Sequence, residues 1–192
     1  MTHLPHGILR RLVGMACFVA LLAMCYGASA ARAASPAAMK TYTAPAKRFT
    51  IQYPPAWHVK SQASGLTTFY LDDPDEGTAL AVWLPTTAWK GEVDASEIMK
   101  AFLQSKAKGD PDLKIATGRQ RKIDAQTTVA QVVLTWTNPR KVAMRGYSEI
   151  DAKQVTGQGY TEFSYRGYQA PASAFNQMEP TFVSMLKSFT VK

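Results

Sequence analysis

Apolar and polar positions alternate along much of the chain, which is typical of β-strands. Phe49, Ile51 and Tyr53 share one face of a predicted strand, and Pro54 ends it. Residues 66–71 and 78–84 predict a hairpin, because an acidic segment with proline and glycine joins two apolar runs. Four further strands are predicted near residues 113–117, 127–136, 142–150 and 160–166. Their short connections indicate antiparallel pairing.

Two segments repeat their apolar residues at helical spacing. Asp94 is a favourable N-cap with Glu97 at the third helical position, and this helix is expected to end near Gly109. A second helix is expected over residues 172–187, and Pro180 either kinks it or opens another helix. The predicted fold is therefore α+β, with an antiparallel sheet of about six to seven strands covered by two main helices in a layered sandwich.

The N-terminal segment has the order of a secretory signal peptide. Arg10 and Arg11 precede an apolar run over residues 12–23, and small residues follow with cleavage expected after Ala30 or Ala33. The run is shorter than the roughly 20 residues of a membrane span, although an uncleaved anchor remains an alternative. We therefore expect a signal peptide over 1–33, a short flexible linker over 34–46 and one domain over 47–192, with no membrane span after cleavage. The protein would then be periplasmic or secreted.

The cysteine content and the net charge limit which chemistry the exported domain can carry out. Both cysteines, Cys17 and Cys25, lie in the leader, so the domain has neither a disulfide nor a thiolate nucleophile. Lipidation of Cys25 is an open alternative, because residues 22–25 loosely resemble a lipobox. Loss of the leader lowers the formal net charge from +8 to +5, which we interpret as a solvated, mildly basic surface. The alternative is attraction to anionic envelope polymers or lipid headgroups, which this charge and compartment favour over nucleic acid.

The basic residues of the domain fall into two groups on either side of one long predicted strand. A strand of ten residues separates the groups by about 30 Å, so they form no single nucleic-acid-binding patch. The groups are Arg119, Arg121 and Lys122, and Arg140, Lys141 and Arg145.

Two terminal signatures resemble the PsbP-like superfamily, which includes exported DcrB-type proteins. The first is an opening F-x-I-x-Y-P-x-x-W strand, and the second is the apolar pattern of the last helix. They comprise Phe49, Ile51, Tyr53, Pro54, Trp57, Phe182, Leu186 and Phe189. These are core-type residues, so the resemblance implies a fold and a non-catalytic role in binding or assembly, with an envelope protein or an apolar segment of one as partner.

Trp57 is expected to anchor the core, although its neighbours are typical of a loop. A tryptophan just past a strand-ending proline folds back over the sheet edge. The alternative is an exposed aromatic that binds a ligand.

Catalysis has one candidate group. The domain has a single histidine, His58, no cysteine and no G-x-S-x-G motif, so a nucleophile with a neighbouring base is not evident. Glu149, Asp151 and Glu162 lie on adjacent predicted strands, and a small hydrolase that uses them is the alternative function.

An acidic loop is the candidate metal site. Asp72, Asp73, Asp75 and Glu76 supply carboxylates within five positions, as a weak calcium site does. Pro74 interrupts the usual ligand spacing, so a solvated acidic turn is the preferred interpretation. His58 is expected to be a structural or surface residue, because a lone histidine makes no zinc site. No other cofactor is expected.

Overall fold

The computed structural model describes residues 38–73 and 77–192, and residues 38–192 form one compact unit. The predicted leader, its cleavage sites and Cys25 lie outside the described residues, as do Asp75 and Glu76. Within the described part, no helix is long and apolar enough to cross a membrane.

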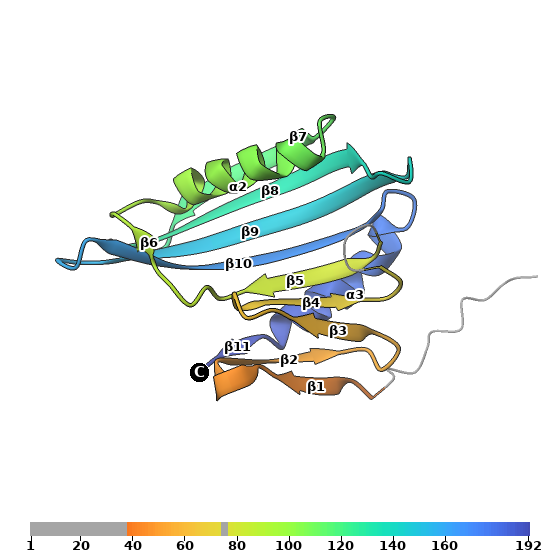
Figure 1. Ribbon diagram of the computed structural model, residues 1–192, viewed down its shortest axis with the longest axis horizontal. Helices are drawn as coiled ribbons and strands as arrows, with labels where there is room; N and C mark the ends of the chain where they lie inside the picture. The colour runs from red at the N-terminus through yellow and green to blue at the C-terminus, as the bar shows by residue number, and fades with distance from the viewer. Residues whose placement is uncertain (1–37, 74–76) are drawn as a thin grey trace, which may run out of the picture. The chain divides into compact units, whose positions relative to one another are not determined.

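An eight-stranded antiparallel sheet forms the main body of the domain (Figure 1). Its order is β3-β4-β5-β10-β9-β8-β7, and the two-residue β6 pairs with one end of β10. The bounds are β3 His58–Ser61, β4 Leu66–Tyr70, β5 Ala79–Trp83, β6 Trp89–Lys90, β7 Lys114–Lys122, β8 Thr127–Thr137, β9 Ala143–Val155 and β10 Tyr160–Pro171. The antiparallel sheet and two helices confirm the predicted α+β class.

The opening strand does not belong to this sheet. β2 (Phe49–Tyr53) lies between β1 (Lys40–Thr43) and β11 (Thr190–Val191) in a separate three-stranded sheet. A short 3₁₀ helix, η1 (Pro45–Lys47), joins β1 to β2. The prediction of a flexible linker over 34–46 is therefore wrong for residues 40–46, because β1 is hydrogen-bonded along the whole of its length to β2.

The two helices pack on opposite faces of the eight-stranded sheet (Figure 1). α2 (Ala95–Gly109) packs on β8 and β9, whereas α3 (Phe175–Lys187) packs on β10 and on β2. Residues opposite one another on neighbouring strands point to the same face, so the strand register assigns every side chain. We call these the α2 face, which carries Leu134 and Ile150, and the α3 face, which carries Leu80 and Tyr168.

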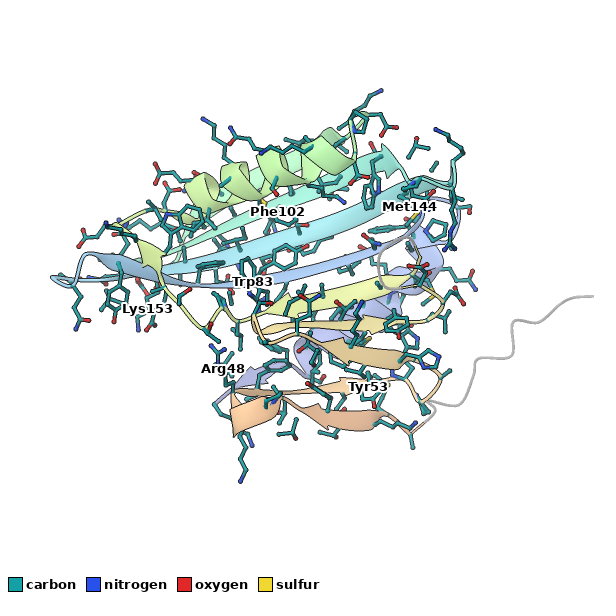
Figure 2. All side chains as sticks on the ribbon, in the orientation of Figure 1. Arg48, Tyr53, Trp83, Phe102, Met144 and Lys153 are labelled. Carbon is teal, nitrogen blue, oxygen red and sulfur yellow. The ribbon has the colours of Figure 1, made fainter. Side chains whose placement is uncertain are left out.

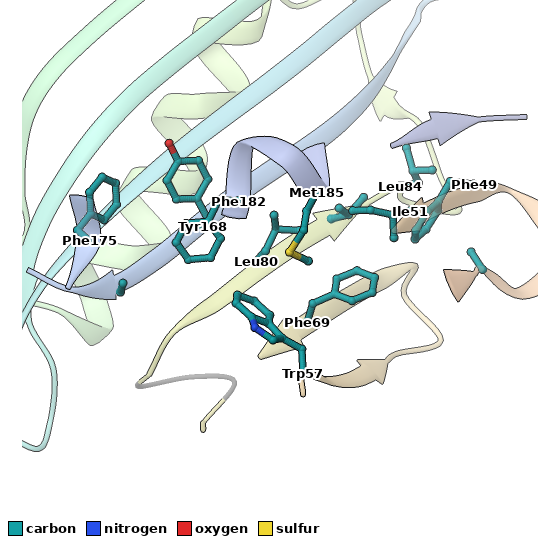
Figure 3. Close-up of a cluster of buried hydrophobic side chains, with 13 residues drawn as sticks. Phe49, Ile51, Trp57, Phe69, Leu80, Leu84, Tyr168, Phe175, Phe182 and Met185 are labelled. Carbon is teal, nitrogen blue, oxygen red and sulfur yellow. The ribbon is translucent and has the colours of Figure 1, made fainter. Parts of the chain in front are cut away.

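The larger core lies between the α3 face, α3 and the three-stranded sheet (Figure 3). Phe49, Ile51, Trp57 and Phe182 are all buried there, and the ring of Trp57 meets Phe182 edge-on at 5.7 Å between centroids. The remaining members of the two signatures are half-buried around this core: Tyr53, Pro54, Leu186 and Phe189. Met185, outside the predicted apolar stripe of the last helix, is completely buried.

Several predicted boundaries are too short. β7 continues to Lys122, β9 to Val155 and β10 to Pro171, because each strand pairs with a long neighbour throughout. α3 begins at Phe175 and not at 172, since the amide of Ala172 donates to the carbonyl of Ala143 and extends the sheet. Pro180 lies inside α3, so it does not open a second helix.

The start of α2 matches its prediction. Asp94 Oδ1 accepts hydrogen bonds from the amides of Ser96 (2.8 Å) and Glu97 (3.1 Å), and Glu97 Oε2 accepts one from the amide of Asp94. The Ser96 hydroxyl, at 2.6 Å, and these amides hold the pKa of Asp94 below its ordinary value. The capping box therefore satisfies amides that the first helical turn leaves without partners.

Asp94→Ala is expected to lower the free energy of unfolding by about 1 kcal/mol, because the cap is lost. Asp94→Asn is the control, since asparagine caps nearly as well. The lowered pKa contributes stability above the unfolded-state pKa, and the wild type loses it as the pH falls through the folded-state pKa. Thermal unfolding at neutral and acidic pH measures both effects, and equal stability of Asp94→Ala and wild type at neutral pH would contradict the prediction.

Candidate functional site

A groove of about 480 Å³ runs along α2 on the α2 face. We call it the aromatic groove. α2 forms one wall with Phe102, Ser105 and Lys106, and strands β4, β5, β10, β9 and β8 supply the floor and the other wall. Figure 2 shows Phe102 and Trp83, which both contribute rings to it. The groove exists because α2 packs on β8 and β9 and leaves the β4 and β5 side of this face open.

Small residues keep the floor of the groove low. Ala79 and Ala81 on β5, Gly146 on β9 and Gly167 on β10 all lie on the α2 face. A Cβ atom at Gly146 would approach the Trp136 ring to 3.0 Å, and one at Gly167 would overlap the Tyr165 hydroxyl at 2.2 Å. Glycine at these two positions therefore allows both rings to lie close against the sheet.

The aromatic side chains are held by contacts with their neighbours. Tyr165 packs against Phe102 with 4.9 Å between ring centroids, and its hydroxyl lies 3.2 Å from Ser148 Oγ. Trp83 Nε1 donates to the carbonyl of Ser64 at 2.9 Å. Lys106 Nζ lies 4.1 Å from the centroid of the Trp136 ring. A preformed site of this kind costs little conformational entropy when a ligand binds.

The chemistry of the groove favours binding. Its charged lining residue is Lys106, which also forms an ion pair with Asp110 at 2.8 Å. Among the described residues that line it, there is no carboxylate, histidine or cysteine. Burial raises the pKa of Tyr165, which therefore stays a neutral phenol that can donate a hydrogen bond. The groove thus offers apolar surface with a few orienting polar groups, as ligand sites do.

The α3 face carries a different feature, which we call the polar ladder. Arg119, Gln131, Glu149 and Arg166 lie directly opposite one another on β7, β8, β9 and β10. Arg119 Nε donates to Gln131, Gln131 donates to Glu149, and Arg166 Nη2 donates to Glu149 Oε1 at 2.5 Å. Arg166 also forms an ion pair with Asp151. One guanidinium therefore balances two carboxylates.

Glu149 and Asp151 respond differently to this environment. Burial raises the pKa of Glu149, but hydrogen bonds from Tyr147 and Gln131 and the charge of Arg166 outweigh it, and the net pKa is lowered. Burial raises the pKa of Asp151 despite the opposing charge of Arg166. Both carboxyl groups are thus committed to a structural ion-pair network.

The structure does not assemble the proposed hydrolytic group. Glu162 is exposed and lies opposite Lys153, and it lines a separate depression beside Arg48. None of the described pockets is lined by two of the three carboxylates Glu149, Asp151 and Glu162. A hydrolase would need two of them in one concave site, so the geometry gives this alternative no support.

The candidate calcium ligands are only partly described. Asp72 is exposed, and Asp73 Oδ2 accepts a hydrogen bond from Arg140 at 2.7 Å. Within residues 38–73 and 77–192, no group of three or more histidine, cysteine or acidic side chains is placed to hold a metal ion. A site that includes Asp75 and Glu76 stays a prediction.

The other predicted surface residues lie apart from the groove. His58 is exposed on β3, where its ring lies 5.4 Å from that of Tyr70. The first basic group belongs to β7, whereas Arg140 and Lys141 lie in the turn between β8 and β9. Arg145 stacks on Phe175 with 4.8 Å between the guanidinium carbon and the ring centroid.

The aromatic groove was not predicted from the sequence. Two local signals point to it: glycines within otherwise strong strands, and alanines at alternate positions of β5 leading to Trp83. Glycine inside a strand often marks the close approach of another group. Neither signal says which residues of α2 form the opposite wall.

The comparisons with known proteins concern the fold. No family model and no curated protein sequence matches the chain. The solution structure of cyanobacterial PsbP (CyanoP) from Synechocystis sp. PCC 6803 superposes with a TM-score of 0.54 at 14% identity, covering 83% of this chain and 96% of that one. LpqN of Mycobacterium tuberculosis, described as involved in cell envelope biogenesis, superposes with a TM-score of 0.51 at 11% identity, covering 83% and 87%. With its antiparallel sheet and its two helices on opposite faces, the chain has the PsbP-like fold.

Proposed function

We propose that this protein is a non-catalytic binding module of the cell envelope that holds an apolar segment of a partner protein in the aromatic groove. The observation that carries the proposal is the groove itself, with aromatic walls from Phe102, Trp136 and Tyr165 above a floor of small residues. The envelope location rests on the predicted leader, and it agrees with the description of LpqN.

Several features support a segment of protein as the ligand. The groove extends along α2 across five strands, which suits an extended chain. The hydroxyl groups of Ser148 and Tyr165, which lie 3.2 Å apart in the groove, can also bond peptide carbonyls or amides. The described lining residues include no carboxylate, histidine or cysteine, which is consistent with a role without catalysis.

Photo-crosslinking tests the proposal. Benzoylphenylalanine at Ala81, on the groove floor, should crosslink in intact cells of the native host to an apolar segment of an envelope protein, identified by mass spectrometry of the digested adduct. The matched control is Ser184, which is exposed on α3 and lies away from the groove. Lipid adducts, no adducts, or the same adducts from both positions would contradict the proposal.

A synthetic peptide with the crosslinked sequence then gives the affinity. Ala81→Glu should weaken its binding by more than about tenfold, because the groove would bury an unpaired carboxylate. Ser184→Glu should leave the affinity unchanged. Fluorescence of Trp83 and Trp136, which line the groove, follows the titration.

A further inference from the structure

The edge strand β7 of the eight-stranded sheet is strongly basic. Among residues 38–73 and 77–192, β7 pairs with β8 alone and nothing pairs with its other edge, and all nine of its residues are exposed. Lys114, Arg119, Arg121 and Lys122 give it four cations and no acid. The flanking Asp112 and Asp124 are also exposed; Asp112 accepts a hydrogen bond from the amide of Thr137, and Asp124 accepts hydrogen bonds from the amides of residues 126 and 127.

Exposed apolar side chains lie at both ends of this basic strand. Ile115 is 57% exposed and Ile123 is 53% exposed, the highest fractions among the described large apolar residues apart from Val191 at 56%. Together with the four cations they form what we call the β7 edge surface. Separately, a groove of about 670 Å³ between β7 and α2 has an apolar lining that includes Met99, Leu103 and Ile115.

Charge and shape suit this surface to one kind of partner. A second strand is disfavoured, because a β-bulge between Ile115 and Thr117 interrupts the register and edge cations oppose strand addition. The β-bulge and the edge cations do not explain why the two isoleucines are exposed. A flat anionic layer with an apolar interior accommodates both: long basic side chains reach its charged surface, while isoleucine enters the interfacial region.

We propose that the β7 edge surface docks on a lipid bilayer with anionic headgroups. The four cations provide the attraction, at about a fivefold gain in partitioning for each charge close to the surface. Ile115 and Ile123 add apolar contact at the ends of the strand, and Ile115 also lines the neighbouring apolar groove. This docking is independent of the aromatic groove, which lies on the other side of α2.

Vesicle sedimentation of the full chain tests the proposal. The wild type should partition more than about tenfold better onto phosphatidylcholine vesicles with phosphatidylglycerol than onto phosphatidylcholine alone, and salt should reduce this preference. The apolar N-terminal segment is the same in every variant. The ratio of partitioning onto vesicles with and without phosphatidylglycerol, which we call the gain, therefore measures the effect of charge. Replacing Lys114, Arg119, Arg121 and Lys122 with glutamine should abolish that gain.

Two further variants test whether the lipid preference depends on the β7 edge surface or only on the total charge of the protein. The matched control replaces four exposed lysines elsewhere with glutamine, namely Lys60, Lys90, Lys153 and Lys187, and it should keep most of the gain. Lys114→Gln, Lys122→Gln leaves the polar ladder intact and should lose on the order of tenfold. Equal losses in the two fourfold variants, or a wild type without lipid preference, would overturn the proposal. Melting temperatures of all the variants verify that each remains folded.

Discussion

Trp57→Ala is expected to lower the free energy of unfolding by about 3 to 5 kcal/mol, the usual range for a large aromatic removed from a packed interior. The side chain is only 6% exposed, and its ring packs edge-on against Phe182 in the larger core. Truncation would leave a cavity between β3, α3 and the three-stranded sheet. The loss is a large share of a typical total stability of about 5 to 15 kcal/mol.

Thermal and denaturant unfolding measure this loss. Trp57→Phe is the conservative control, since it keeps a ring against Phe182 and should lose less than half as much. Trp83→Ala removes a half-exposed tryptophan from the aromatic groove and should affect binding more than stability. A shift of less than about 3 °C for Trp57→Ala would count against its role in the core, because about 1 kcal/mol alone moves a domain of this size by about 2 to 4 °C.

Arg166→Met is expected to cost about 2 to 4 kcal/mol, somewhat less than the loss from breaking a fully buried ion pair. Arg166 is the shared partner of Glu149 and Asp151, whose side chains are 14% and 32% exposed. Without the guanidinium, two neighbouring carboxylates remain in a partly desolvated site. Methionine keeps much of the side-chain volume, so the loss reflects charge more than packing.

The pH dependence distinguishes this mechanism from simple loss of packing. Without Arg166, both carboxyl groups should have folded-state pKa values above their unfolded values, so folding favours their protonated forms. The difference in stability between wild type and variant should therefore shrink as the pH falls through the raised folded-state pKa values of the variant, so the decrease should begin above the ordinary carboxyl value of about 4. Arg119→Met, which removes the exposed arginine of the same ladder, should cost at most about 1 kcal/mol. A loss that is the same at neutral and acidic pH would rule out the electrostatic explanation.

The fold class could be predicted because its signals are local. Alternation along residues 127–136 already indicates which side chains of β8 point to one face, and the Asp94 and Glu97 pair fixes the start of α2. The hairpin of β4 and β5 follows from a turn between two apolar runs. These features depend on residues a few positions apart, where backbone geometry alone decides which side chains meet.

Strand ends and strand partners were less predictable. The alternation of β2 indicates a half-buried strand but not its partner, and β2 pairs with β11 from the far end of the chain. β7 extends to Lys122 because β8 provides hydrogen-bonding partners along its length, although the sequence there is polar. Pairing with a neighbouring strand thus overrides local preference.

The sequence by itself determined the two helices, most of the longer strands and the carboxylates to be considered as a site, but it did not show β1, β3, β6 or β11. Only the tertiary structure decided that Arg166 holds Glu149 and Asp151 together, and that Phe102 on α2 faces Trp83 on β5 across a glycine and alanine floor. The physical reason is that these groups come from segments far apart in the chain, and strand order and register bring them together. Neither order nor register is encoded in the alternation of a single strand.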